Sequence, residues 1–179
     1  MPFHHVAIST RDLQGTHDFY IEVMGFSLVK TEAAPAPEGG WARHLFYDTG
    51  NGECLAVWDV HEDPAVPDNF DPSISRGLGL PSWTNHLAFA APDLAALERH
   101  QQRWVDHGYD VLRLDHGWCQ SIYINDPNDI AVEFCCTTQA FTDADRTQAE
   151  AQRRAEMPVL GDPPPPQFIE GKHAEGAHP

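Results

Sequence analysis

Two segments of this chain repeat one pattern, and the repeat limits the folds that the chain can adopt. HHVAISTRDL places His5 seven residues before Asp12, and NHLAFAAPDL places His86 seven residues before Asp93. In both segments small side chains alternate with bulky ones, a period of two that is typical of a β-strand with two different faces. Such self-similarity predicts two copies of one structural module.

The two copies also continue in the same way. Asp12 can cap a helix over about 13–24, whose apolar residues keep helical spacing and which Gly25 can end. In the second copy, which begins at Thr84, Gly108 takes the place of Gly25. Three strands should complete each module, over about 26–31, 41–49 and 53–60 in the first and 109–115, 118–125 and 129–137 in the second.

The sequence therefore predicts an α+β fold of two paired βαβββ modules that share one cup. The expected divisions are a first module, a connecting loop, a second module and a C-terminal segment, over 1–60, 61–83, 84–138 and 139–179. In the last division we expect a solvent-exposed helix over about 143–156. The proline-rich tail from Gly161 should be extended or disordered and should not contribute to the core.

Charge and composition exclude several classes of function. The net charge of -16 and the pI near 4.8 would repel phosphate backbones and anionic lipids, so no nucleic acid or membrane partner is expected. The sequence has no apolar run long enough to span a bilayer, and its four cysteines show no CxxC spacing. We expect free thiols in a cytoplasmic protein whose partner is a small molecule.

Strand alternation selects three candidate metal ligands. It places His5, His86 and Glu133 on inner faces, because a shift of one residue moves a side chain to the opposite face. Any one of them alone would be read as an ordinary strand residue, but together they form a donor set for one divalent metal. The position that corresponds to Glu133 in the first module is about Ala56, which cannot ligate, so three protein ligands are expected. His4 should point away.

Several motifs resemble the vicinal oxygen chelate superfamily, which includes glyoxalase I, fosfomycin-modifying enzymes, bleomycin-binding proteins and extradiol dioxygenases. The resemblance covers about residues 3–137. The motifs are His5-Val6, Asp12-Leu13 through Phe19-Tyr20 to Gly25-Phe26, His86-Leu87, and Asp126-Pro127 leading to Glu133-Phe134. The resemblance implies paired modules that form a curled mixed sheet around an open metal-binding cup, and we expect a homodimer or higher homo-oligomer. Asp129 stands where this superfamily usually has glycine, and aspartate tolerates the left-handed backbone such a turn needs.

Within the superfamily, Tyr123 favours one activity. It lies ten residues before Glu133 with the same inward parity. Extradiol dioxygenases have a tyrosine at a similar place, which hydrogen-bonds the metal-bound hydroxyl of the catechol. They also have an acid–base histidine, for which His116 is the best candidate and His44 and His61 are weaker ones. Alternatively, Tyr123 is a core aromatic and His116 an ordinary loop histidine.

The leading prediction is an enzyme that cleaves the ring of a catechol-like aromatic diol with O2, at one divalent metal. Fe(II) is favoured, and Mn(II) or Zn(II) would accept the same donors. The alternatives are a glyoxalase-like lyase or isomerase, a resistance transferase with another divalent metal, and a non-enzymatic binding protein of the bleomycin-resistance type. A four-ligand glyoxalase I site would need a carboxylate near Ala56. Three aromatic side chains are expected to line the cup: Phe46, Trp58 and Trp118. Three histidines on predicted helices are expected to be solvated: His17, His100 and His107.

Overall fold

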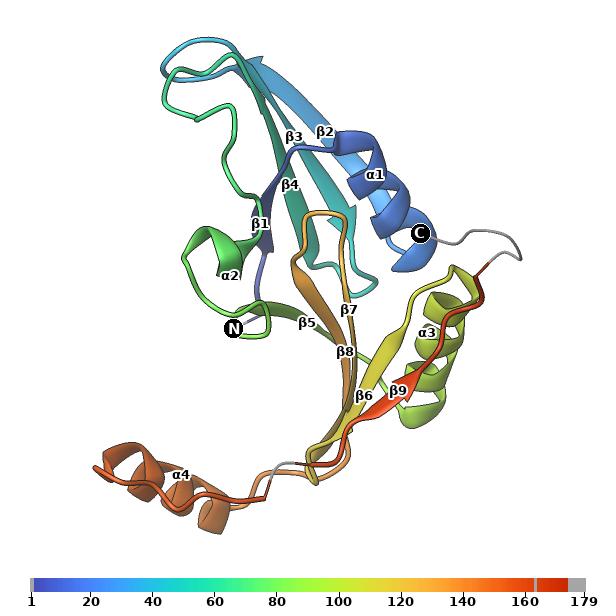
Figure 1. The fold of residues 1–179 in the computed structure, drawn as a ribbon, viewed down its shortest axis with the longest axis vertical. Coiled ribbons are helices and arrows are strands. Elements are labelled where there is room, and N and C mark those ends of the chain that lie inside the picture. The colour runs from blue at the N-terminus through green and yellow to red at the C-terminus, as the bar shows by residue number, and fades with distance from the viewer. Residues whose placement is uncertain (1, 163, 174–179) are drawn as a thin grey trace.

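The computed structural model describes residues 2–162 and 164–173 and contains two mixed β-sheets that share one hydrophobic core (Figure 1). In chain order the elements are β1 (His5–Thr10), α1 (Leu13–Asp18), the π-helical turn η1 (Phe19–Val23), β2 (Ser27–Pro35), β3 (Trp41–Asp48), β4 (Cys54–His61), α2 (Ile74–Gly77), β5 (His86–Ala90), α3 (Leu94–Asp106), β6 (Val111–Asp115), β7 (Cys119–Asn125), β8 (Ala131–Thr137), α4 (Asp143–Arg154) and β9 (Gln167–Ile169). Within the described ranges, no helix is long and apolar enough to cross a bilayer.

The two sheets have the same strand order, which confirms the paired βαβββ modules. The first sheet is β1-β4-β3-β2, and the second is β5-β8-β7-β6 with β9 added at its edge. In each module the first strand pairs in parallel with the last, while the other neighbours pair antiparallel. The predicted α+β class is therefore correct.

Equivalent strands also have equivalent registers. Ala7 on β1 lies opposite Ala56 on β4, and Ala88 on β5 lies opposite Glu133 on β8. Ala7 and Ala88 each lie two residues after the histidine that opens their module. Ala56 and Glu133 thus occupy corresponding places, as the sequence predicted.

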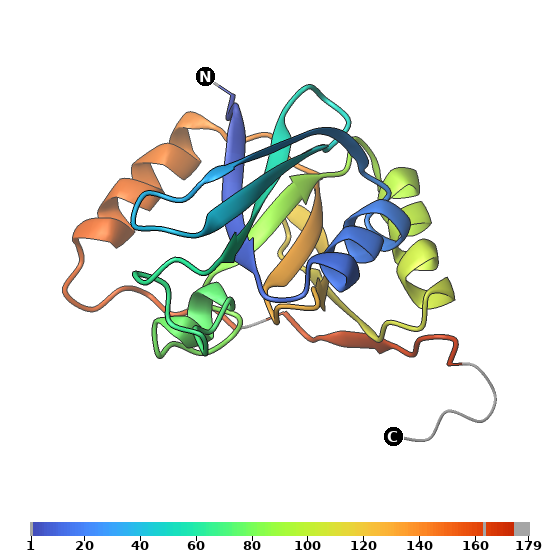
Figure 2. The same cartoon turned by 90° about the horizontal axis from the view of Figure 1, so that it is seen from above.

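Each module's helix begins at the expected aspartate. The Asp12 side chain accepts a hydrogen bond of 2.9 Å from the Gly15 N–H, and Asp93 accepts one of 2.6 Å from Ala96. Both are side-chain caps of free N–H groups at a helix start. The helices α1 and α3 lie on the same side of the strands (Figure 1 and Figure 2), and the core lies between the helices and the sheets.

Two helical histidines differ from the expectation, because they are half-buried rather than solvated. His17 lies with its Nδ1 atom 3.1 Å from the Tyr47 hydroxyl. The other is His100. Its ring stacks on that of Phe134 with centroids 3.7 Å apart, and burial lowers its pKa to about 4. His100 lies three residues after Leu97 and four before Trp104, both fully buried. This spacing is that of one helix face, so His100 belongs to the core-facing side of α3.

Buried polar side chains join the first module to the turn between β7 and β8. The Tyr20 hydroxyl donates a hydrogen bond of 3.0 Å to Asp126. Asn128 donates from its amide to Thr16 at 3.0 Å and accepts a hydrogen bond of 2.9 Å from Thr10. All five residues are buried. Because buried polar groups require partners, this set holds the two modules in one arrangement.

The connecting segment contains the short helix α2 and contacts the same turn. Asp129 has a φ of 58°, the left-handed backbone expected of it, and its carboxylate pairs with the Arg76 guanidinium. The Ser73 hydroxyl donates to the Asp129 carbonyl oxygen at 2.9 Å, and the Asn125 amide donates to its carboxylate at 2.6 Å. The turn therefore survives without glycine, and the aspartate makes contacts that glycine would lack.

The C-terminal segment departs most from the sequence-based expectation. Helix α4 has no buried residue, starts with a capping box of Thr142 and Asp145, and lies apart from both sheets (Figure 1), as expected for a solvent-exposed helix. The tail, however, forms β9, which pairs with β6 and packs Ile169 against the core. The expectation that the tail contributes nothing to the core is wrong for this strand. For residues 163 and 174–179 it lies outside the described residues.

Close backbone contact holds the chain beyond β9. A Cβ on Gly171 would lie 2.5 Å from the carbonyl carbon and oxygen of Gly108, so this position requires glycine. The Gly171 N–H donates to the Asp110 carboxylate at 2.8 Å, and the Lys172 N–H donates to the Val105 carbonyl at 2.8 Å. The tail is thus attached to the end of α3 and the segment that follows it.

Replacement of this glycine tests whether the tail contributes to stability. Gly171→Ala should lower the free energy of unfolding by about 1–3 kcal/mol, because the added methyl group forces two backbone segments apart. Gly161→Ala is the matched control: its Cβ would meet nothing within 4 Å, and the change should stay within about 0.5 kcal/mol. Urea denaturation measures both, and equal midpoints for the two variants would contradict a stabilising role for β9.

Candidate metal and acid–base site

A row of side chains crosses the second sheet on the face away from the core. Residues directly opposite one another on neighbouring strands are Ala88, Glu133, Tyr123 and Leu112, on β5, β8, β7 and β6. Opposite residues project from the same face of a sheet, so these four side chains stand side by side. Val132, next to Glu133, is fully buried in the core on the other face.

Two of the predicted metal ligands lie together at this row. The His86 Nε2 atom is 3.1 Å from Glu133 Oε2. Glu133 is buried, with 5% of its surface exposed, whereas the His86 side chain is 39% exposed. The pair therefore presents one nitrogen and one oxygen donor to an accessible space. This donor set fits a divalent metal such as Fe(II), Mn(II) or Zn(II).

The two predicted catalytic residues also form a pair. The Tyr123 hydroxyl is 3.1 Å from His116 Nε2. His116 stands in the turn between β6 and β7, where its backbone N–H donates to the Cys119 carbonyl at 2.9 Å. Burial raises the pKa of Tyr123 well above its ordinary value, and the negative charge of Glu133 raises it further. The phenol thus stays protonated and can donate to the Nε2 atom of His116.

His5 lies on the first sheet, apart from this group. Its ring centroid is 6.0 Å from that of His44, and its Nδ1 atom is 2.7 Å from Nδ1 of His4, which was expected to point away. Over residues 2–162 and 164–173, no three His, Cys, Asp or Glu side chains are placed to hold one metal ion. A single chain therefore brings together His86 and Glu133 but not His5, and the three-ligand site stays a prediction.

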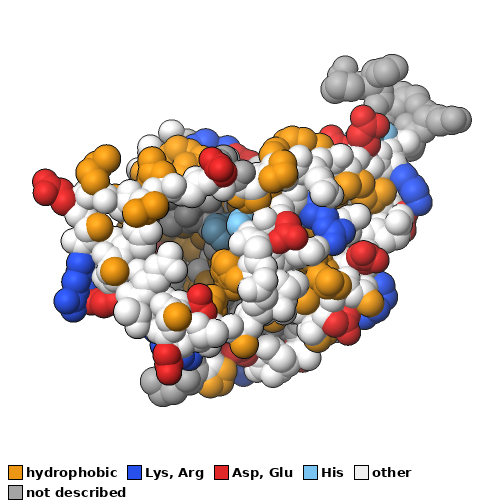
Figure 3. Space-filling view, turned by 90° about the horizontal axis from the view of Figure 1, so that it is seen from below, with side chains coloured by type: hydrophobic (Ala, Val, Ile, Leu, Met, Phe, Trp, Pro, Cys, Tyr) orange, Lys and Arg blue, Asp and Glu red, His pale blue; other side chains and the backbone are white. Residues whose placement is uncertain are grey.

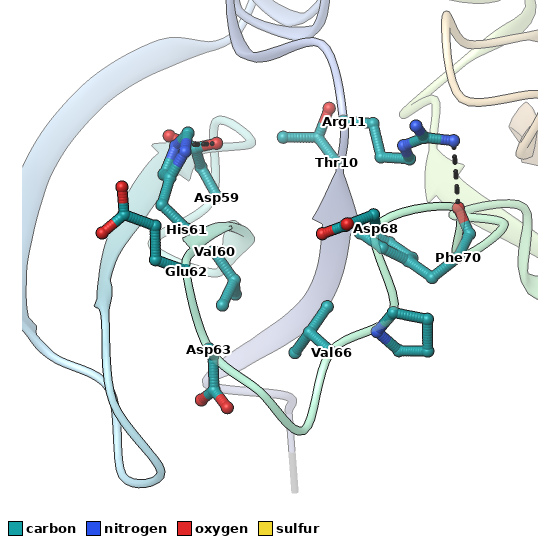
Figure 4. A pocket seen from close by; sticks show the side chains of 11 residues that line it. Thr10, Arg11, Asp59, Val60, His61, Glu62, Asp63, Val66, Asp68 and Phe70 are labelled. Carbon is teal, nitrogen blue, oxygen red and sulfur yellow. Dashed lines mark hydrogen bonds and ion pairs between the residues drawn. The ribbon is translucent and has the colours of Figure 1, made fainter.

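The two weaker candidates for the acid–base histidine, His44 and His61, also lie away from the pair of Tyr123 and His116. His44 stacks on Trp58 with ring centroids 3.7 Å apart, and burial together with the nearby His5 lowers its pKa. His61 lines a separate acidic cavity of about 250 Å³, where its Nε2 is 2.8 Å from an Asp59 oxygen (Figure 4). Neither histidine lines the cavity that Tyr123 faces.

That cavity has a volume of about 370 Å³ and opens beside the row. His86 and Tyr123 line it together with Trp83 and two leucines of β6, Leu112 and Leu114. Seen from below, histidine side chains lie in a hollow of the molecular surface that hydrophobic side chains border (Figure 3). A mostly apolar cavity of this size with a few polar groups is typical of small-molecule sites.

The apolar side of this cavity is formed by residues that were not predicted from the sequence, namely Trp83, Leu112 and Leu114. Three aromatics were expected to line the cup, namely Phe46, Trp58 and Trp118. None of the three lines this cavity. Trp118 packs instead on Phe141, with ring centroids 5.0 Å apart. The alternation of Leu112 and Leu114 around Arg113 is the signal that could have identified β6, because both leucines share the inward parity of that strand.

Comparison with known families decides the assignment of the chain. The family described as the Glyoxalase/Bleomycin resistance protein/Dioxygenase superfamily matches residues 3–134. The chain belongs to this superfamily. The match confirms the resemblance carried by the sequence motifs and agrees with the paired modules of the fold. Divalent metals and small-molecule ligands are typical of this superfamily. No curated protein matches the sequence.

Solved structures are similar to this member of the superfamily in fold. A glyoxylase/bleomycin resistance protein/dioxygenase domain from Frankia sp. EAN1pec is 15% identical, with a TM-score of 0.56 over 76% of this chain and 98% of that one. Lactoylglutathione lyase from Agrobacterium tumefaciens is 20% identical, with a TM-score of 0.50 over 75% and 92%. TnmS3, an antibiotic binding protein from Streptomyces sp. CB03234, is 19% identical, with a TM-score of 0.50 over 77% and 97%. At these identities the likeness concerns the fold alone.

Metal analysis of variants tests the ligand set. His5→Ala and Glu133→Ala should each lose bound metal, because each removes one of three donors. His107→Ala is the control, since this exposed histidine hydrogen-bonds to the Arg103 carbonyl of its own helix end at 2.8 Å. The protein is reconstituted with Fe(II) without oxygen, and bound metal is measured by elemental analysis. Full metal content in Glu133→Ala would place the site elsewhere.

Proposed function

We propose that this chain is a metal-dependent, ring-cleaving dioxygenase of the extradiol type, which acts on a catechol-like aromatic diol with O2. The observation that carries the proposal is the hydrogen-bonded pair of Tyr123 and His116 on the face that also holds His86 and Glu133. A group that positions a diol hydroxyl and a group that accepts its proton are thus placed beside two metal donors.

We assign the metal to His86 and Glu133 of one chain and His5 of a second copy. Within one chain the described residues do not supply a third ligand. His5 opens the first module as His86 opens the second, and a symmetric pair of chains can set the first module of one against the second module of the other. Ala56 leaves the fourth place without a ligand, so coordination positions stay open for a chelating diol and O2.

The chain's own residues have distinct parts in the proposed reaction. When bound, Fe(II) would supply the Lewis acidity that lowers the pKa of the diol and the route for electrons to O2. Tyr123 donates its O–H to one diol oxygen and fixes the ring, and His116 Nε2 accepts the proton that the diol releases. Because the pKa of Tyr123 is raised, the phenol does not act as the base. The cleaved ring bond supplies the electrons and both atoms of O2 enter the product, so no further reductant is needed.

A non-enzymatic small-molecule binding protein is the second candidate. It is favoured by the apolar cavity and by the lack of a three-ligand group within the described part of one chain. TnmS3, which shares the fold, is described as an antibiotic binding protein. The third candidate is a lyase, the activity named for the structurally similar lactoylglutathione lyase from Agrobacterium tumefaciens, or a transferase. It ranks third because Ala56 stands where a four-ligand site would have a carboxylate.

Replacement of the tyrosine tests the proposed chemistry. Tyr123→Phe should keep the fold and the metal but lower kcat by about 10²–10⁴-fold, the range for a positioned acid–base group. The measurement is oxygen uptake with a panel of catechols after anaerobic Fe(II) reconstitution, together with the absorbance of the yellow ring-opened product. Tyr109→Phe is the matched control, because Tyr109 packs against the core and should leave the rate nearly unchanged.

Two outcomes would remove the dioxygenase proposal. Tight binding of catechols by the metal-free protein, with no oxygen uptake after Fe(II) reconstitution, would favour the binding protein. Turnover of a 2-oxoaldehyde adduct, or a thiol addition, with Zn(II) or Mn(II) would favour the lyase or the transferase.

Mixing two inactive variants tests whether two chains build one site. His5→Ala and Glu133→Ala chains, unfolded and refolded together, should recover about a quarter of the wild-type metal sites, since half of the pairs are mixed and each mixed pair has one intact site. Each variant refolded alone is the control and should recover none. If the mixture also binds no metal, the three residues do not form a shared site between chains.

A further inference from the structure

The row of side chains on the second sheet continues onto a strand outside the family match. Leu112 of β6 lies opposite Phe168 of β9, so Phe168 projects from the same face as Leu112, Tyr123 and Glu133. Phe168 is 77% exposed, whereas its neighbour Ile169 packs against the core on the other face. The match ends at residue 134, so β9 is an addition to the two modules.

The spacing of the strands gives this row a length. Neighbouring strands lie about 4.8 Å apart. Leu112 is on the strand next to Tyr123, and Phe168 is on the strand after that, about 10 Å from Tyr123. Leu114, on the same face of β6, and Trp83, which is 75% exposed, border the cavity as well. The cavity is lined as far as Leu112 and Leu114, and Phe168 stands one strand beyond them on the same face. A ring-sized substituent on a diol bound at Tyr123 would therefore extend from Leu112 toward Phe168.

The chemistry of this side of the cavity favours an uncharged group. Among the described residues that line the cavity, none is lysine or arginine. The Asn125 amide donates to Asp129 and is committed to that turn. A substrate carboxylate placed here would lose hydration without gaining a cation. An apolar group would instead be removed from water by Leu112 and Phe168, which is favourable in proportion to the buried area.

We propose that β9 is a specificity element, and that the substrate is an uncharged diol whose apolar, ring-sized substituent lies against Leu112 and Phe168. The inference rests on the proposed diol chemistry at Tyr123 and specifies which diols that site accepts. Leu112 forms the near part of the apolar wall and Phe168 its far part, and the attachment of the tail at Gly171 holds Phe168 in place.

The first experiment compares three substrates in the Fe(II)-loaded protein: catechol, 3-phenylcatechol and a carboxylated catechol. We expect kcat/KM to be highest for 3-phenylcatechol and lowest for the carboxylated compound. Phe168→Ala should lower the ratio of kcat/KM for 3-phenylcatechol to that for catechol about tenfold, as expected for loss of apolar contact with a substituent. Phe168→Arg should shift preference toward the carboxylated catechol. Met157→Ala is the control, because Met157 is 83% exposed in the same C-terminal segment and should leave the ratio unchanged.

A second variant and a second readout separate specificity from folding and from turnover. Gly171→Ala keeps Phe168 but loosens β9, and should lower the same ratio. Binding of 2-hydroxybiphenyl, a phenol that lacks the second hydroxyl, is measured by calorimetry with metal-free protein. Phe168→Ala should weaken this binding about tenfold, whereas Met157→Ala should not.

The outcomes distinguish this inference from the proposed function. If no diol is turned over but the binding of 2-hydroxybiphenyl still depends on Phe168, the apolar wall stands and the dioxygenase assignment fails. If diols are turned over but neither the substrate ratio nor the binding responds to Phe168→Ala and Gly171→Ala, the role of β9 is overturned. Preference for the carboxylated catechol by the wild-type chain would also overturn it.

Discussion

Burial of the Asp126 carboxylate is the constraint on which the rest of the structure depends. A carboxylate removed from water is costly unless hydrogen bonds replace its hydration, and here burial raises its pKa despite the donors around it. Tyr20 of the first module is one donor, and backbone N–H groups of the turn between β7 and β8 supply others. The same carboxylate therefore closes the turn and fixes the modules relative to each other. Tyr123 and Glu133 lie on the two strands that this turn joins, so their relative position follows from it.

Features that depend on neighbouring residues could be predicted from the sequence. Strand alternation has a period of two, so the shared face of Glu133 and Tyr123 follows directly from their even spacing and from the short turn between them. The same argument placed Ala56 at the position that corresponds to Glu133, and the equivalent pairings of Ala56 with Ala7 and of Glu133 with Ala88 confirm it. The start of each helix was equally local, because an aspartate caps the N–H groups of the residues that follow it. The sequence offered Tyr123 and His116 only as separate candidates, and the structure brings them together across the turn between β6 and β7.

Features that depend on contacts between distant segments could not be predicted in this way. The matched positions of His5 and His86 indicate equivalent strands, but the distance between them depends on how the modules pack, which no local period describes. Asp126 lies in an Asp-Pro-Asn turn whose composition is typical of exposed loops, and one of the donors that stabilise its buried carboxylate, Tyr20, comes from the distant first module. Strand β9 has three residues after a run of prolines, too few for a period, and it exists because β6 offers an open edge. His100 is an exception, because its spacing from Leu97 and Trp104 could have predicted that it lies on the core-facing side of α3.

The C-terminal addition places an exposed residue and a core-facing residue next to each other on one short strand. Helix α4 and the chain after it form a tether, which keeps β9 at a local concentration of about millimolar, so a strand of three residues can stay docked through few hydrogen bonds. Along this strand Ile169 faces inward and Phe168 faces outward. A substitution at residue 168 therefore changes the surface beside the cavity while folding is almost unaffected. Under the proposed role of β9, a substitution at Phe168 would change ligand preference and leave both modules, which lie within or close to the family match over residues 3–134, unaltered.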